Sequence, residues 1–165
     1  MVCNDDYVST TKRYLKDYKK KKTALSNLKE ELKEKTELQG MDVNASIAKY
    51  GTEPGGGYSE LNAVEKATEI SLQLSKDIYN LLSEVGELTK HIKRIDTALD
   101  SLPEDSKQIL TYRYIDGYTW SGVSDRAYIS ERKARYICEN ALQATAYMLF
   151  GSRATNGDRE YVFLK

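Results

Sequence analysis

The chemically most capable residues lie in one short stretch, residues 130–139, which reads SERKARYICE. Apolar or small residues at positions 134, 137, 141 and 142 follow the i, i+3, i+7, i+8 spacing of a buried helix face. Arginine on the opposite face can fork onto O6 and N7 of guanine, glutamate can accept from the amino group of cytosine, and tyrosine can cover a thymine methyl. The stretch therefore predicts a DNA-reading helix, and the alternative is an ordinary solvated face of an amphipathic helix. The outward residues are Glu131, Arg132, Lys133, Arg135, Tyr136 and Glu139.

A DNA-reading helix needs a cap, a tight turn and a supporting helix, and the sequence supplies them in order. Residues 115–117, Ile-Asp-Gly, indicate the end of a preceding helix. Thr119 is expected to cap a short helix, residues 125–129 to form the turn, and Ser130 to cap the reading helix. The preceding helix should bury Ile109, Leu110 and Tyr114, and the helix-turn-helix core should contain Trp120, Val123, Ile129, Ala134 and Ile137.

The same region can hold the DNA backbone. The free amides at a helix N-terminus bind phosphate. Ser130, at the start of the reading helix, is therefore expected to contact a DNA phosphate. Lys133 and Arg135 can bind phosphates as well, and such contacts position a domain without specifying sequence.

The front half of the chain must position this module, and its pattern predicts two long helices. The first should cover residues 5–38, begin at Asn4 or Asp5 and end at Gly40. We interpret the basic run at residues 19–22 as a solvated helix face, and the alternative is a phosphate-binding patch. The helical seam consists of Tyr7, Tyr14, Tyr18, Leu25, Leu28 and Leu32.

Residues 39–59 contain a proline and a Gly-Gly-Gly run and are expected to form a loop. The second helix should cover residues 60–99 with Ser59 as its N-cap, which at 1.5 Å per residue is roughly 60 Å. Such a helix cannot bury its stripe alone. We expect an antiparallel hairpin that dimerises, and the alternative is a continuous parallel coiled coil. The stripe consists of Ile78, Leu81, Leu82, Val85, Leu88, Ile92, Ile95 and Leu99.

Composition limits the classes of function. The 165 residues carry 25 Lys and Arg against 25 Asp and Glu, so nucleic acid cannot be held by bulk charge and any basic surface must be local. Cys3 and Cys138 match no metal-ligand spacing, and His91 is the one histidine and reads as a solvated helix residue. Because no phosphate loop or serine elbow occurs either, we expect no enzyme, no metal and no cofactor. No apolar run could span a bilayer, and the N-terminus is not a signal peptide, which favours a cytoplasmic protein.

Together these patterns predict an all-α protein: a long helical hairpin or coiled-coil arm followed by a C-terminal helix-turn-helix domain. The arm should comprise residues 1–100, with the loop at 39–59. The helix-turn-helix domain should comprise residues 101–150, followed by a tail at 151–165 whose apolar residues 161–164 could dock or fray.

Residues 102–149 resemble the promoter-reading C-terminal domain, region four, of bacterial sigma factors. The likeness rests on Leu-Pro at 102–103, Tyr-Arg-Tyr-Ile-Asp-Gly-Tyr-Thr-Trp at 112–120, Ile-Ser-Glu-Arg at 129–132 and Ala-Leu at 141–142. With the helical front half and the loop containing GGGYSELNAVEKA, the whole layout is similar to phage transcriptional regulators of the RinA and ArpU type, which activate late genes. The resemblance implies base contacts by Glu131, Arg132 and Tyr136, and backbone contacts near Lys133 and Arg135.

Two residues depart from the sigma pattern. Tyr128 stands where the turn usually has glycine, so the turn must avoid a left-handed conformation or strain into it. Ser124 stands where a small alanine usually packs.

The leading hypothesis is a sequence-specific, DNA-binding transcription regulator, an activator of phage or prophage late genes in a bacterial host cell. Its expected partners are double-stranded DNA, further copies of itself as a homodimer or higher oligomer, and the host RNA polymerase. One alternative is a small terminase subunit that recognises phage DNA for packaging. Another is a helical adaptor that binds protein, such as RNA polymerase, and never touches DNA.

Overall fold

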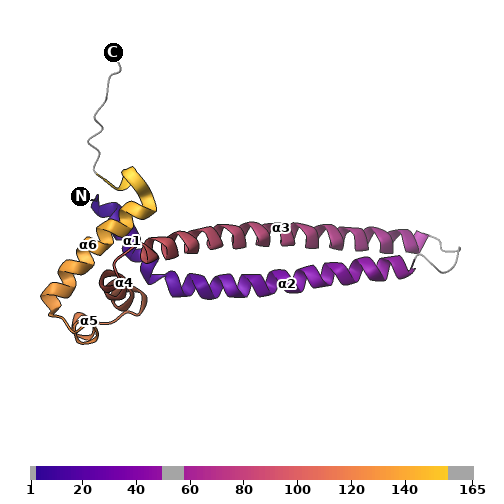
Figure 1. Ribbon diagram of the computed structural model, residues 1–165. Helices are drawn as coiled ribbons and strands as arrows, with labels where there is room; N and C mark the ends of the chain where they lie inside the picture. Colours follow the sequence, from indigo (N-terminus) through magenta and orange to yellow (C-terminus); the bar gives the residue numbers. More distant parts are fainter. Residues whose placement is uncertain (1–2, 50–57, 156–165) are drawn as a thin grey trace, which may run out of the picture. The chain divides into compact units, whose positions relative to one another are not determined.

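The structure, a computed structural model, describes residues 3–49 and 58–155, and these ranges are built from helices. In these ranges no strand is present, and the one extended pairing is an isolated bridge between Cys3 and Thr155. The expected all-α class is confirmed. The elements are α1 (Asp5–Lys16), α2 (Tyr18–Lys49), α3 (Tyr58–Asp100), α4 (Glu104–Leu110), the π-helical turn η1 (Thr111–Ile115), α5 (Trp120–Ala127), α6 (Glu131–Phe150) and the 3-10 turn η2 (Gly151–Ala154) (Figure 1).

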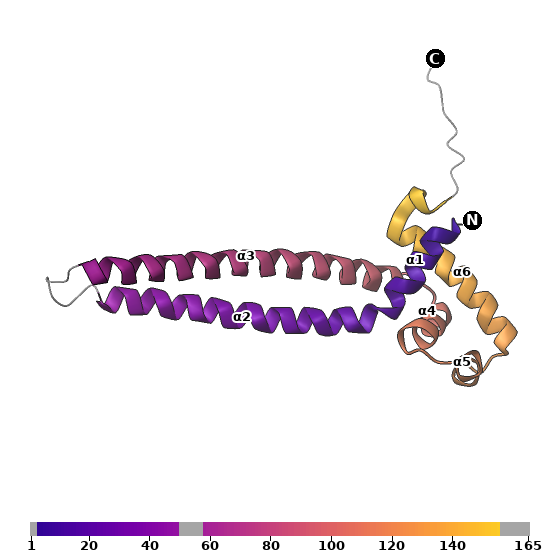
Figure 2. The same cartoon turned by 180° about the vertical axis from the view of Figure 1, so that it is seen from behind.

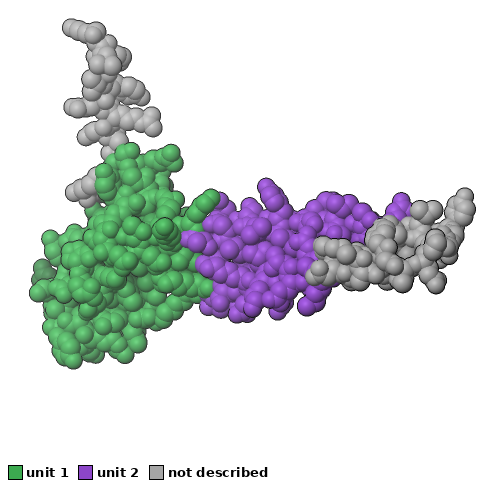
Figure 3. All heavy atoms as spheres, turned by 45° about the vertical axis from the view of Figure 1, so that its right-hand side comes forward, with its two compact units in different colours: residues 1–22, 90–165 green, residues 23–89 purple. Residues whose placement is uncertain are grey.

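Contacts divide the chain into two compact units (Figure 3). Unit 1 combines the two ends of the sequence, Met1–Lys22 and Lys90–Lys165, and unit 2 is Thr23–Thr89. The expected boundary near residue 100 therefore differs from the observed one. Residues 3–22 pack with the C-terminal helices instead of belonging to an arm, because Leu15 of α1 is fully buried in the same core as α4 and α6.

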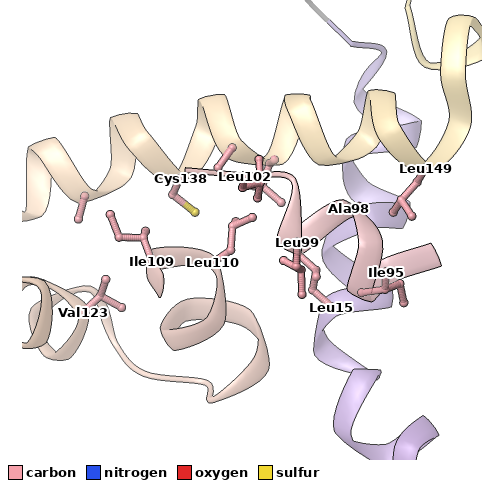
Figure 4. Packing of buried hydrophobic residues seen from close by; sticks show 13 residues of the cluster. Leu15, Ile95, Ala98, Leu99, Leu102, Ile109, Leu110, Val123, Cys138 and Leu149 are labelled. Atoms are coloured by element: carbon pink, nitrogen blue, oxygen red, sulfur yellow. The ribbon is translucent and has the colours of Figure 1, made fainter. Parts of the chain in front are cut away.

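The core of unit 1 is formed by α1, the last turns of α3, and α4 to α6 (Figure 4). Leu15, Ile95 and Leu110 are completely buried, and Ile109 and Leu142 are within 2% of complete burial. Full burial of each such side chain contributes about 1.5–3 kcal/mol to folding. The two buried threonines, Thr11 and Thr145, satisfy their hydroxyls by donating to the carbonyl oxygens of Tyr7 and Ala141.

The first predicted helix is interrupted. A single helix over residues 5–38 was expected, but α1 ends at Lys16, and Asp17, with φ −86° and ψ −2°, forms a turn before α2. Aspartate is a poor helix former, and packing of α1 against α6 in unit 1 overrides the continuous seam. Asn4 caps α1, as one of the two predicted positions, by accepting from the amide of Asp6 at 3.1 Å.

Unit 2 is an antiparallel helical hairpin formed by α2 and α3, which run side by side in Figures 1 and 2. Lys35 Nζ of α2 lies 3.3 Å from Asp77 Oδ2 of α3, and Gln39 Nε2 donates to Ser75 Oγ at 2.9 Å. The predicted hairpin is therefore present within one chain. The predicted stripe is wrong at one residue, Leu82, which is 53% exposed because it lies beside the seam that Ile78 and Leu81 occupy.

The expected loop at residues 39–59 is also wrong at both ends. The helix continues through Gly40 to Lys49, and α3 begins at Tyr58, so Ser59 lies inside the helix and is not its N-cap. Gly40 weakens a helix by only about 1 kcal/mol, and residues 41–49 contain no proline to stop it. The rest of the predicted loop, residues 50–57, and the tail residues 156–165 lie outside the described residues.

Candidate nucleic-acid interface

The turn between α5 and α6 is built by side-chain caps at both helix starts. Thr119 Oγ1 accepts the amide of Gly122, and Ser130 Oγ accepts the amide of Lys133, both at 3.3 Å. Both predicted caps are confirmed. The predicted turn at residues 125–129 begins too early, because α5 continues to Ala127. The carbonyl of Ser124 accepts the amides of Tyr128 and Ile129 and so extends this helix.

The two departures from the sigma pattern have opposite consequences for this turn. Tyr128 adopts the left-handed conformation, φ 54° and ψ 39°, and its side chain is 93% exposed. The turn therefore strains into the geometry that glycine usually provides, at about 1–2 kcal/mol. Ser124, in contrast, stabilises the turn, because its hydroxyl donates to the carbonyl of Ile129.

The inner face of α6 fixes the helix against α4 and α5 (Figure 4). Ala134 is fully buried and Cys138 is 1% exposed, so small side chains bring the helix axes close together. Of the five predicted core residues, Val123 and Ala134 are fully buried, whereas Trp120, Ile129 and Ile137 are partly buried against the same cluster.

Cys138 was missed as a core position, although its spacing of four from Ala134 could have revealed it. Burial raises the pKa of the Cys138 thiol to about 11, so the thiol is neutral and is no nucleophile. Burial likewise raises the pKa of its neighbour Tyr114 to about 12.

The outer face of α6 presents the predicted reading residues, which fall into two groups. Arg132, Lys133 and Tyr136 are exposed, and the Tyr136 side chain is 67% open to solvent. Glu131 and Arg135 are also exposed but pair with each other, with 3.2 Å between Arg135 Nη2 and Glu131 Oε2. Both groups can meet a ligand, because the contact between Glu131 and Arg135 uses only one carboxylate oxygen and one guanidinium nitrogen.

Stacked arginines and aromatic rings adjoin the start of α6, which the sequence did not reveal. The Arg113 and Arg135 guanidinium carbons lie 4.6 and 4.8 Å from the centre of the Trp120 ring. The Arg126 guanidinium carbon lies 3.7 Å from the centre of the Tyr118 ring. These cation–π contacts hold the guanidinium groups in fixed positions, at about 0.5–2 kcal/mol each.

Arg113 is held further by donating from Nη1 to the carbonyl of Tyr118 at 2.7 Å. No periodicity in the sequence links Arg113, Arg126 and Arg135 to their rings, because the contacts come from three different elements. An arginine fixed in this way loses less conformational entropy when it binds a phosphate.

The basic run at residues 19–22 lies on the surface of unit 1 and contacts other residues of that unit. Lys19 Nζ pairs with Asp116 Oδ1 at 2.7 Å, and Lys22 Nζ lies 3.8 Å from Asp96 Oδ1. Lys21 Nζ lies 3.3 Å from His91 Nε2. Lys19, Lys20 and Lys22 are nevertheless exposed, as the predicted solvated face requires, and Lys21 is partly buried. Because Lys19 and Lys22 pair with carboxylates, the run is not a free phosphate patch.

His91 also differs from its prediction, because it is half-buried instead of solvated. The Tyr14 ring packs edge-on against it with 4.4 Å between ring centres. Burial lowers the pKa of His91, with Lys21 and Arg94 adding to the effect, so the imidazole is neutral.

Charge is distributed unevenly between the two units. Unit 1 contains 19 Lys and Arg against 13 Asp and Glu, a net charge of +6. The remaining 6 basic and 12 acidic residues give unit 2 a net charge of −6. The neutral total of the chain thus conceals a basic unit that contains α5 and α6.

In the described part of the chain, no group of three or more His, Cys, Asp or Glu side chains is arranged to hold a metal ion. None of the helices described there has the length and apolar character that crossing a bilayer requires.

Comparison with known proteins identifies a family and nothing narrower. No curated protein matches the chain, and no solved structure does. The family described as "Protein of unknown function (DUF722)" matches residues 8–146, which include α5, the turn and most of α6. Because this match covers more than four fifths of the 165 residues, the chain belongs to the DUF722 family.

Proposed function

We propose that the protein is a sequence-specific DNA-binding transcription regulator in which α5, the turn and α6 act as a helix-turn-helix. The observation that carries the proposal is the start of α6, where Arg132, Lys133 and Tyr136 are exposed while Ala134 and Cys138 anchor the opposite face. This is the geometry by which a recognition helix enters the major groove with its N-terminal residues toward the base edges.

The roles of the exposed residues follow from their chemistry. Arg132 is exposed and can fork onto guanine, and Tyr136 can cover a thymine methyl. Lys133 meets a phosphate. Glu131 can accept from a cytosine amino group through Oε1 while Oε2 stays paired with Arg135.

Ser130 has a double role in the proposal, because its Oγ caps the helix and its hydroxyl proton remains available to a phosphate. Arg113, Arg126 and Arg135, stacked on their rings, provide further preorganised phosphate contacts beside the reading helix. The net charge of +6 on unit 1 supports an interface with DNA there.

The biological setting is part of the proposal and rests on the sigma-like residues at 102–149 and the regulator-like layout. We infer that the protein activates late genes of a phage or prophage in the bacterial cytoplasm and contacts the host RNA polymerase there.

The test compares two arginine variants on a duplex selected by the wild-type protein from a random library. Arg132→Ala is expected to weaken specific binding by about 1–3 kcal/mol and to relax the preference at one base pair. Arg153→Ala is the matched control, because Arg153 is an exposed arginine beyond the far end of α6. Equal effects of the two variants would remove Arg132 from base reading.

A helical adaptor is the second candidate, and one observation favours it. A shallow hollow lined by Asn140, Gln143, Ala144, Tyr147 and Met148 lies on the outer face of α6. An adaptor that docks protein there would keep its function in the Arg132→Ala variant and lose it in Tyr147→Glu.

A further inference from the structure

The exposed side of α3 carries a second apolar stripe beside the one that faces α2. Leu72, Tyr79 and Leu82 are 58%, 73% and 53% exposed, although they are large and apolar. Together with Ser75 and Gly86 they recur at alternating spacings of three and four residues, the a and d pattern by which one helix packs on another. A hollow lined in part by Leu72, Ser75 and Tyr79 lies along this stripe. The pattern predicts that another helix packs on this stripe.

We propose that this occupant is α3 of a second copy of the chain, running antiparallel, with the two-fold axis at Tyr79. In this register the large Leu72 side chain meets the partner's Gly86, and the two Tyr79 rings meet at the axis. Gly86 is suited to receive a leucine, because a Cβ built on it would find no atom within 4 Å. A large residue thus fits a small one on both sides of the axis, as an isologous interface requires.

Charge selects the same orientation. Glu65 and Lys93 are exposed and lie seven residues before Leu72 and seven after Gly86, so they extend the same stripe. The antiparallel register places Glu65 opposite the partner's Lys93 at each end. A parallel pair would place Glu65 beside the partner's Glu65, and Gly86 beside the partner's Gly86 with a gap between them.

The pairing is independent of the proposed DNA binding, because it uses a different helix and different residues. In this proposal the hairpin forms a dimer, and the stripe on α3 is the interface of the predicted oligomer.

Cysteine cross-linking with a short bismaleimide tests the orientation. Leu72→Cys and Gly86→Cys proteins are mixed, allowed to exchange, and treated in the native state. The mixture is expected to give a covalent dimer, whereas each variant alone is not, because equivalent positions would then be about 21 Å apart along the helix. Wild-type protein is the control, since Cys3 and Cys138 are 4% and 1% exposed. A dimer from Leu72→Cys alone, or no dimer from the mixture, overturns the antiparallel register.

Sedimentation of unlabelled protein tests the interface itself. Tyr79→Glu is expected to weaken the dimer at least about tenfold, because it removes an aromatic pair and brings two carboxylates together at the axis. Ile70→Glu is the matched control: Ile70 is 63% exposed on the same helix but lies off the stripe, so the dimer should persist. An unchanged dimer in Tyr79→Glu, or equal loss in both variants, overturns the proposal.

Discussion

Replacing Tyr128 with glycine is expected to stabilise unit 1, even though the change deletes a large aromatic side chain. Tyr128 has φ 54° and ψ 39°, where an L-residue other than glycine is strained by about 1–2 kcal/mol. Its side chain is 93% exposed, so almost no apolar burial is lost. Glycine raises the entropy of the unfolded chain, which offsets about 0.4–1 kcal/mol of the gain. The free energy of unfolding should therefore rise by roughly 0.5–1 kcal/mol.

The assay is urea unfolding followed by the fluorescence of Trp120, the one tryptophan of the chain. For a slope of about 2 kcal/mol per molar urea, the midpoint should rise by roughly 0.4 M. The control makes the same chemical change at Tyr136, which is 67% exposed but lies within α6. There glycine should lower the free energy of unfolding by about 0.5 kcal/mol, because it is the poorer helix former. If both variants fall in stability, the strain assigned to Tyr128 is refuted.

Three further predictions concern other parts of the molecule. Trp120→Ala should lower the free energy of unfolding by about 2–3 kcal/mol, because a partly buried ring and two guanidinium stacks are lost; unchanged melting by circular dichroism would contradict this. The Cys138 thiol, with its pKa raised from 9.0 to about 11, should resist a thiol reagent at pH 8 until the protein unfolds. Because the unfolded thiol ionises first, its contribution to stability is complete below pH 9.0 and is lost as the pH rises toward 11. Glu65→Lys and Lys93→Glu should each weaken the dimer by about 0.2–1 kcal/mol per contact, and the double variant should restore it; additive losses in sedimentation would speak against the register.

The sequence predicted the local structure of unit 1 best where a single residue has a strong preference. Thr119 and Ser130 cap helices because their oxygens accept the amide three positions on, and this depends on nothing distant. Prediction from the sequence failed where packing between distant segments determines the end of a helix. The interruption at Asp17 follows from burial of Leu15 against other helices. The exposure of Leu82 depends on which of two neighbouring stripes faces α2, which the apolar pattern leaves open.

The exposed positions of the candidate site could be predicted from the sequence, but the contacts between its side chains could not. The outward positions of α6 follow from helical periodicity, and Arg132 and Tyr136 are exposed as expected. That Arg135 is shared between Glu131 and Trp120 depends on how α5 and α6 approach each other, and no spacing along the chain encodes it.

We propose that the start of α6 reads DNA sequence. The most direct measurement is a fluorescence-anisotropy titration of the full chain against duplexes from upstream of neighbouring genes, with a scrambled duplex as control and with salt varied. We expect binding to one duplex at least about 10³-fold tighter than to the scrambled control, with both affinities falling as salt rises. Equal binding to both duplexes, or none to either, would contradict sequence reading by Arg132 and Tyr136.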